Sequence, residues 1–161
     1  MELNFDIRGN LTPYETVDVE HDVFVNTFVT SFDSNSSRHS LYKKYTDYSN
    51  ELSAFLSRPY YQWIDGSFIS IKTNPRDIDL VTVIHYQDYE EHANAIASRF
   101  VGSQARALYQ VDAYIVADYP KGHRKFAFAH SDKLYWMSLF GKTRVNRAKR
   151  QYDKGFIQLS F

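Results

Sequence analysis

The sequence contains no cysteine among its 161 residues, which excludes disulfide bonds, thiolate nucleophiles and cysteine-based zinc sites. No run of residues approaches the roughly twenty consecutive apolar residues that a membrane-spanning helix needs. The first residues are polar, so no signal peptide is expected. Together these absences predict a cytoplasmic protein that has no membrane partner.

Several motifs that mark common nucleotide and hydrolase sites are also missing. Neither a Gly-x-x-x-x-Gly-Lys loop nor a Gly-x-Gly-x-x-Gly fingerprint occurs, which argues against a P-loop or a Rossmann site. The six histidines show no paired spacing such as His-x-x-x-His, so a zinc hydrolase is not expected. A serine-hydrolase elbow is absent too.

Length and composition predict one folded domain over residues 1–161. A chain of this length with 43% hydrophobic content can bury a single core. We divide the chain into a helical N-terminal extension over residues 1–58, a central core over 59–120 and a C-terminal segment over 121–161. The central part is expected to carry the functional site.

Hydrophobic periodicity predicts an α/β (α+β) domain with a small mixed sheet and flanking helices. One pattern at helical spacing lies at residues 24–32 and another at 41–55, and Pro59 closes the second. Ser131 is expected to cap the last helix and Gly141 to end it. We expect strands over residues 60–65, 77–84, 110–117 and 154–161, helices over about 87–100 and 131–140, and a flexible loop over 141–153.

The most informative segment joins a glycine turn to a pair of carboxylates. Gly66 and Ser67 follow an apolar strand, and a nine-residue spacer separates them from Asp77 and Asp79. Side chains alternate along a strand, so the two aspartates, roughly 7 Å apart, point the same way. Their repulsion makes most sense if a cation neutralises them, and oxygen ligands favour Mg²⁺ or Mn²⁺. The glycine permits close backbone approach, and the serine can open a helix whose N–H groups receive a phosphate.

This pattern resembles the signature of the nucleotidyltransferase superfamily that includes DNA polymerase beta. In that signature a hydrophobic strand, Gly-Ser or Gly-Gly, a spacer and Asp-x-Asp follow one another. More narrowly, the chain is similar to small bacterial proteins with a minimal nucleotidyltransferase domain. The similarity extends over most of the chain, at Arg8-Gly9-Asn10-Leu11-Thr12-Pro13, Trp63-Ile64-Asp65-Gly66-Ser67-Phe68, Trp136, Phe140-Gly141 and Lys154-Gly155.

The resemblance implies transfer of a nucleoside monophosphate from an NTP, ATP by default, to a hydroxyl group on a protein, RNA or small-molecule acceptor. It also implies that Asp77, Asp79 and a third carboxylate hold Mg²⁺ or Mn²⁺. Residues 109–118 supply Asp112 and Asp118 as candidates for the third, and the motif match favours Asp112. Related small families pair with toxin or defence proteins, which implies a bacterial toxin–antitoxin or defence context.

The same resemblance places the β- and γ-phosphates against Gly66 and Ser67. The ammonium of Lys72, close to this turn in the sequence, is expected to bind the phosphates as well. Each residue also has a plain structural interpretation, as a strand-ending turn, a helix cap and a solvated lysine. Asp65 stands where the superfamily usually has an apolar residue, and we expect a solvated carboxylate at the strand end. The alternative function is therefore a catalytically silent module that keeps the fold and binds a protein partner or nucleic acid.

Charge is unevenly distributed although the net charge is zero. Residues 121–161 carry ten Lys or Arg against two Asp, so this segment holds +8 and the first 120 residues hold −8. Such a segment can steer a nucleotide to the site or bind nucleic acid. Alternatively, these basic residues are solvated, and their charge balances that of an acidic neighbouring region or of a partner chain.

Overall fold

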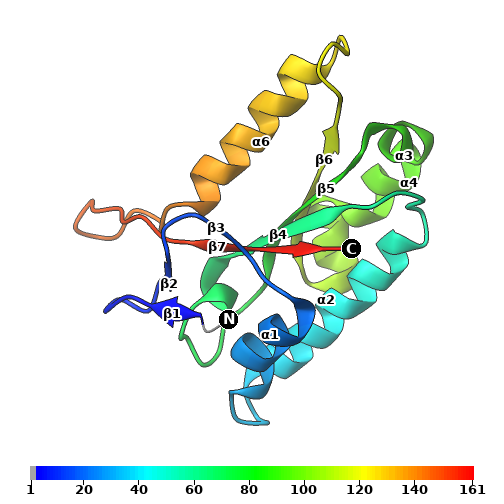
Figure 1. Ribbon diagram of the computed structural model, residues 1–161. Helices are drawn as coiled ribbons and strands as arrows, with labels where there is room; N and C mark the ends of the chain where they lie inside the picture. The colour runs from blue at the N-terminus through cyan, green and yellow to red at the C-terminus, as the bar shows by residue number, and fades with distance from the viewer. Residues whose placement is uncertain (1–2) are drawn as a thin grey trace.

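The structure is a computed structural model that describes residues 3–161. Its fold is α+β, with a mixed sheet flanked by helices, as the periodicity predicts (Figure 1). The strands are β1 (Asn4–Phe5), β2 (Leu11–Thr12), β3 (Thr16–Asp18), β4 (Tyr61–Asp65), β5 (Asp79–His85), β6 (Asp112–Asp118) and β7 (Phe156–Ser160). The α-helices are α1 (His21–Val25), α2 (Ser37–Ser53), α3 (Tyr86–Glu91), α4 (Ala93–Ala95), α5 (Gly102–Tyr109) and α6 (Phe126–Phe140). Short π-helical and 3₁₀ turns add η1 (Asn26–Thr30), η2 (Gly66–Ile69) and η3 (Ile96–Phe100).

Five strands form the main sheet in the order β3-β7-β4-β5-β6, and β1 pairs with β2 in a separate antiparallel ribbon. β7 runs parallel to β3 and antiparallel to β4. β5 runs antiparallel to β4 and parallel to β6. A strand from the C-terminal part of the sequence therefore lies inside the sheet, between strands from its first and middle parts.

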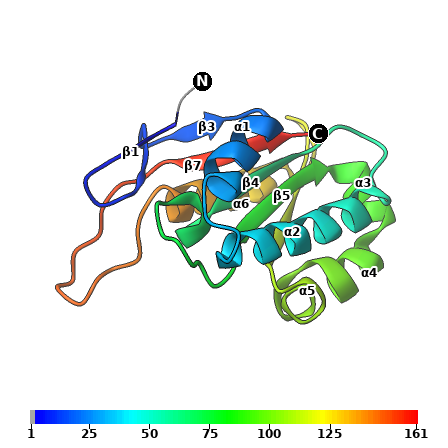
Figure 2. The ribbon, with the colours of Figure 1, turned by 90° about the horizontal axis from the view of Figure 1, so that it is seen from below.

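Helices cover both faces of the sheet. On one face, residues of α1, η1, α2 and α5 pack with Ile64 and Leu80 in a large apolar cluster. Figure 2 shows α2, α4 and α5 together on this side. On the other face, Phe140 of α6 packs against Trp63 and Val81. Because side chains alternate along β4 and β5, these strands contribute residues to an apolar core on each face of the sheet.

The two N-terminal helical patterns form helices, as expected. Phe24 and Phe28 are buried in the first, and Leu41 and Leu52 are buried on the inward face of α2. By contrast, the single helix expected over residues 87–100 is divided into α3, α4 and η3.

The division falls at His92, where the backbone leaves the helical region (φ −112°, ψ 21°). The sequence patterns did not indicate α5, which follows. Its eight residues are fewer than the roughly 11 to 18 over which a helical period is read in a sequence.

α6 begins at Phe126, earlier than the expected start at Ser131, and it ends before Gly141 as expected. Ser131 therefore lies inside the helix and caps nothing. Phe128 and Tyr135 project into solvent from a helix that is apolar on more than one side. No helix in the described part of the chain is long and apolar enough to cross a membrane.

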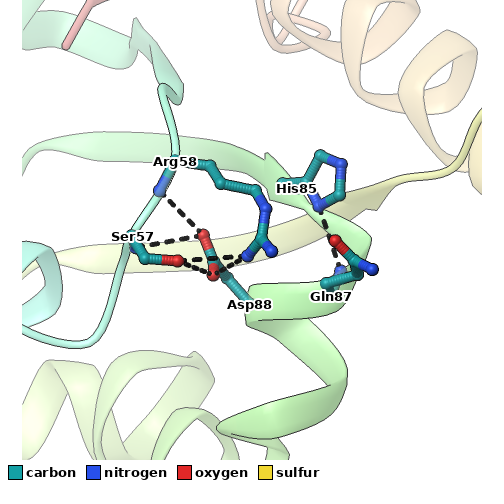
Figure 3. A network of polar contacts seen from close by, with 5 residues as sticks. All are labelled: Ser57, Arg58, His85, Gln87 and Asp88. Carbon is teal, nitrogen blue, oxygen red and sulfur yellow. Dashed lines mark hydrogen bonds and ion pairs between the residues drawn. The ribbon is translucent and has the colours of Figure 1, made fainter.

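Asp88 fastens the segment before β4 to α3 (Figure 3). Its buried carboxylate accepts hydrogen bonds from the Ser57 hydroxyl (2.7 Å), from the Arg58 guanidinium (2.7 Å) and from the N–H groups of both residues (3.2 Å each). Burial alone would raise the pKa of Asp88, but these hydrogen bonds and the charge of Arg58 outweigh it and hold the pKa below its usual value. At the start of the same helix, His85 Nδ1 accepts from the Gln87 N–H (3.2 Å).

We expect Asp88→Asn to lower the free energy of unfolding by about 1–3 kcal/mol, because buried donors lose a charged acceptor. The pKa of Asp88 is lower in the folded than in the unfolded state. Its contribution is therefore present above the unfolded value of 3.8 and is lost as the pH falls through the lower folded value. Urea unfolding near neutral pH and at about pH 3 measures both effects.

The matched control is Asp47→Asn, which removes an exposed i,i+4 ion pair with Lys43. This variant should change the free energy of unfolding by less than about 0.5 kcal/mol. Equal losses in the two variants would contradict the role given to Asp88.

Candidate functional site

Three aspartates lie side by side across the sheet. Strand pairing sets Asp65 at the end of β4 opposite Asp79 at the start of β5, and Asp79 opposite Asp112 at the start of β6. Paired residues of neighbouring strands project to the same face, here the one that α6 covers. Asp118 pairs instead with His85 at the far end of β5, so strand register separates the two candidates for the third carboxylate.

A cleft of about 650 Å³ opens beside this row of aspartates. Its lining includes five residues that the sequence singled out, namely Gly66, Ser67, Lys72, Asp77 and Asp79. Asp65 also lines the cleft, whereas Asp112 does not. The structure therefore brings the Gly-Ser turn and the Asp-x-Asp pair into one cavity and leaves Asp112 at its margin.

Gly66 leaves the space that the Asp79 carboxylate occupies. A Cβ at this position would lie 1.8 Å from Asp79 Oδ2, and the backbone φ of +79° favours glycine. The close approach expected at this glycine is thus made by a side chain of the neighbouring strand. Ser67 does not cap a helix as expected, because it lies within η2, a four-residue 3₁₀ helix with no side-chain cap.

Arg38 holds the segment that follows the Gly-Ser turn. Its side chain is fully buried, and its guanidinium donates to the carbonyls of Phe28 (3.0 Å), Phe68 (2.7 Å), Ser70 (2.7 Å) and Lys72 (2.9 Å). Burial lowers the pKa of Arg38 to about 10, so the group stays charged at neutral pH. Sequence reasoning missed this residue, because no local pattern marks an arginine near a helix start as buried.

Asp65 is buried and paired, which corrects the expectation of a solvated carboxylate. It is 6% exposed and forms an ion pair with Lys154, which precedes β7. Burial raises the pKa of Asp65, and the charge of Lys154 partly offsets this rise. The pair ties the end of β4 to the segment that leads into β7.

Asp79 is partly buried and lies near three other carboxylates. Burial, followed by the charges of Asp77, Asp65 and Asp112, raises the pKa of Asp79 to about 6, while Arg144 acts in the opposite direction. A cation beside this carboxylate would relieve the repulsion.

The two candidates for a third carboxylate are both engaged by basic residues. Arg106 lies 2.7 Å from Asp112, and Lys133 lies 2.6 Å from Asp118. The position of Asp112 beside Asp79 agrees with what the resemblance implies, but its charge is already balanced by Arg106.

The acidic side chains of the cleft can contribute ligands to Mg²⁺, but they cannot enclose it on their own. Within residues 3–161 no three His, Asp or Glu side chains gather closely enough to enclose a metal ion. Asp65 and Asp112 each have a basic partner, which leaves Asp77 and Asp79 as available ligands. Mg²⁺ is commonly bound by one or two carboxylates together with substrate phosphates and water. The residues therefore fit a metal that arrives with a nucleotide, and they do not fit a closed metal cage.

Basic side chains share the lining of the cleft with Asp65, Asp77 and Asp79. Five that line it form no ion pair within the part of the chain that the structure describes: Arg8, Lys72, Arg76, Lys142 and Arg144. Their positive charges are available to an anion that enters the cleft above the carboxylates.

The fold and the cleft together define an α+β protein with an acidic pocket, rimmed by cations, at one end of a mixed sheet. The family model described as a family of unknown function (DUF6932) matches residues 3–160, so the chain belongs to that family. No curated protein and no solved structure matches the chain. None of these comparisons links it to the nucleotidyltransferase superfamily, so that resemblance stays a prediction.

We expect Asp79→Asn to raise the free energy of unfolding near neutral pH by up to about 2 kcal/mol, because it removes a partly buried, repelled charge. The folded-state pKa of Asp79, about 6, lies above the unfolded value of 3.8. The wild-type chain should therefore gain stability relative to the variant as the pH falls from about 6 toward 4. Urea unfolding of both at about pH 7.5 and pH 5 tests this, and a variant that is less stable at neutral pH would refute it.

Proposed function

We propose that the chain is a metal-dependent nucleotidyltransferase that moves a nucleoside monophosphate from an NTP to a hydroxyl acceptor. The observation that carries the proposal is the cleft lined by Asp77 and Asp79 together with five basic side chains that form no ion pair among the described residues. An NTP brings phosphates for the cations and a divalent ion for the carboxylates, so a single ligand meets both requirements. A neutral ligand would leave both sets of charges without partners.

Asp77 and Asp79 would hold Mg²⁺ or Mn²⁺, which when bound supplies positive charge beside the phosphate groups. The Gly66-Ser67 turn and Lys72 receive the β- and γ-phosphates. Because η2 has only four residues, its dipole is short, and the side-chain cations of the rim carry most of the phosphate binding.

In the transfer, the hydroxyl oxygen of the acceptor bonds to the α-phosphorus of the NTP. The bond from that phosphorus to the oxygen bridging to the β-phosphate breaks, and pyrophosphate leaves with the electron pair. We assign to Asp112 the orientation of the hydroxyl and the acceptance of its proton, which then passes to solvent.

A catalytically silent binding module is the second candidate, and a specific observation favours it. Both Asp112 and Asp65 are neutralised by basic residues, so a three-carboxylate metal site is not formed by the described residues. Such a module would bind a nucleotide or a partner in the cleft without transferring a group.

An NTP with Mg²⁺ should raise the melting temperature by several degrees, and by more than either component alone. A ligand at a hundredfold excess over its Kd adds about 2.7 kcal/mol to the free energy of unfolding. Thermal unfolding with each of the common NTPs, and with Mg²⁺ or Mn²⁺, measures the shift. No shift with any combination would rule out the nucleotide site.

In the same mixtures, release of pyrophosphate or incorporation of labelled nucleotide distinguishes the transferase from the silent module. Binding without either product would favour the silent module.

The double variant Asp77→Asn/Asp79→Asn should lose the Mg²⁺-dependent part of the NTP shift and any transferase activity, while its own melting temperature stays at or above that of the wild type. Asp118→Asn is the matched control, because this residue lies on the same sheet face at the far end of β6. The control should keep the full NTP response. A double variant that melts well below the wild type and still responds to Mg²⁺-NTP would show that the two carboxylates are structural.

A further inference from the structure

We propose that residues 141–154, called here the basic arm, bind the sugar-phosphate backbone of a nucleic-acid strand, and that this strand is the acceptor of the transferred nucleotide. The assignment of the strand as acceptor rests on the proposed function, whereas the binding surface does not. The arm extends away from the body of the molecule in both ribbon views (Figures 1 and 2).

The basic arm has a defined shape. The Thr143 N–H donates to the Tyr152 carbonyl (2.8 Å), and the Asn146 N–H donates to the Arg150 carbonyl (2.9 Å), which closes the chain into a hairpin-like loop. At its base the Lys154 N–H donates to the Gly141 carbonyl (2.9 Å). These bonds give the loop expected over residues 141–153 a hairpin-like shape.

Contacts with other segments fix the base of the arm. The Arg8 guanidinium lies 4.1 Å from the centre of the Tyr152 ring, and the Lys154 side chain pairs with the buried Asp65. The Gly155 N–H donates to the Leu11 carbonyl (2.8 Å). The arm therefore leaves the cleft in a direction that the fold determines.

The charge of the arm is almost entirely positive. It contains one acidic residue, Asp153, and six basic residues, of which Lys154 is used in the ion pair with Asp65. The other five are exposed and form no ion pair within residues 3–161: Lys142, Arg144, Arg147, Lys149 and Arg150.

The positive charge of the arm continues beyond the lining of the cleft. Lys142 and Arg144 line the cleft, whereas Arg147, Lys149 and Arg150 lie at the tip of the arm and do not. Residues 147–149 form the turn of the hairpin-like loop, where the Lys149 N–H donates to the Asn146 carbonyl (2.9 Å). An NTP bound in the cleft would leave the tip cations without phosphates. A nucleic-acid strand, with a phosphate about every 3.4 Å of helix axis, would supply them.

The arm is suited to phosphates and not to bases. Between residues 141 and 151 the sequence contains no aromatic side chain that could stack on a base, and the ring of Tyr152 is covered by Arg8. Lys and Arg contacts to phosphates carry no sequence information. The structure therefore favours binding that is independent of sequence and strongly dependent on salt.

The experiment measures binding of fluorescent single-stranded RNA and DNA oligonucleotides of about 12 residues to the full chain, from about 50 to 200 mM salt. With five phosphate contacts the affinity should fall roughly 100-fold over that range, since each contact contributes about 0.7 to the slope of log K against log salt. The triple variant Arg147→Ala/Lys149→Ala/Arg150→Ala should lower the slope by about 2 and weaken binding at low salt at least about 10-fold.

The matched control is Lys43→Ala/Lys121→Ala/Arg124→Ala, which removes the same charge from exposed positions in α2 and in the connection between β6 and α6. This control should bind the oligonucleotides almost as the wild type does. Equal losses of oligonucleotide affinity in the two triple variants would show that only the net charge of the protein matters. That result would overturn the assignment of binding to the arm. Tighter binding to anionic lipid vesicles or to polyglutamate than to the oligonucleotides would overturn the choice of nucleic acid.

Two further measurements separate this inference from the proposed function. The arm variant should keep the Mg²⁺-NTP melting shift, and Asp77→Asn/Asp79→Asn should keep oligonucleotide binding. Oligonucleotide binding with no NTP shift would refute the nucleotidyltransferase and leave the arm as a nucleic-acid surface. An NTP shift with no oligonucleotide binding would refute the arm alone. Labelled nucleotide added to the oligonucleotide by the wild type, and much less by the arm variant, is the result expected for the acceptor.

Discussion

The structure around the cleft depends on the burial of one positive charge among carbonyl oxygens. Arg38 brings a guanidinium from α2 into the interior, where the backbone of η1 and of residues 67–72 supplies its acceptors. Desolvating this group is costly unless its donors are satisfied, so the arrangement holds only while those carbonyls converge. The segment between β4 and β5 has little regular structure of its own, and Arg38 supplies the constraint that a longer helix would otherwise provide. The turn that contains Gly66 is therefore held in position by Arg38, which does not itself line the cleft.

In the absence of a ligand, the carboxylates of the cleft repel one another and several of its basic side chains lack an ion-pair partner among the described residues. Asp79 lies against Gly66 and near other carboxylates, while five cations of the cleft lining form no ion pair among the described residues. A sequence selected for stability alone would pair these charges with one another, as Asp88 and Arg58 are paired in this protein. Local conflicts of this kind are expected where a protein binds something, because the ligand completes the charge balance.

Local periodicity predicted much of the fold, and contacts between distant residues account for what it missed. The strand around Leu80 and the face of α2 follow from spacing along the chain. β5 begins at Asp79, so Asp77 lies before the strand expected over residues 77–84, and strand parity does not account for its place with Asp79 in the cleft. The ion pair between Asp65 and Lys154, and the register that sets Asp112 beside Asp79, depend on which strands become neighbours. No local pattern contains that information. α5 was missed for a different reason, since its eight residues are too short a stretch for a helical period to be read.

Because β7 lies inside the sheet, the cleft can form only after this strand has joined the sheet during folding. β3 pairs with β7 from Thr16↔Phe156 onward, so one of the first strands of the sequence joins the sheet only after a very long loop has closed. Loops of that length close late, because the entropy lost in closing them is recovered only when the distant contacts form. Lys154 arrives with β7, and with it the partner of Asp65. An incompletely synthesised chain would therefore present open strand edges and no cleft, so any ligand of the cleft meets a binding site only when synthesis and folding of these residues are complete.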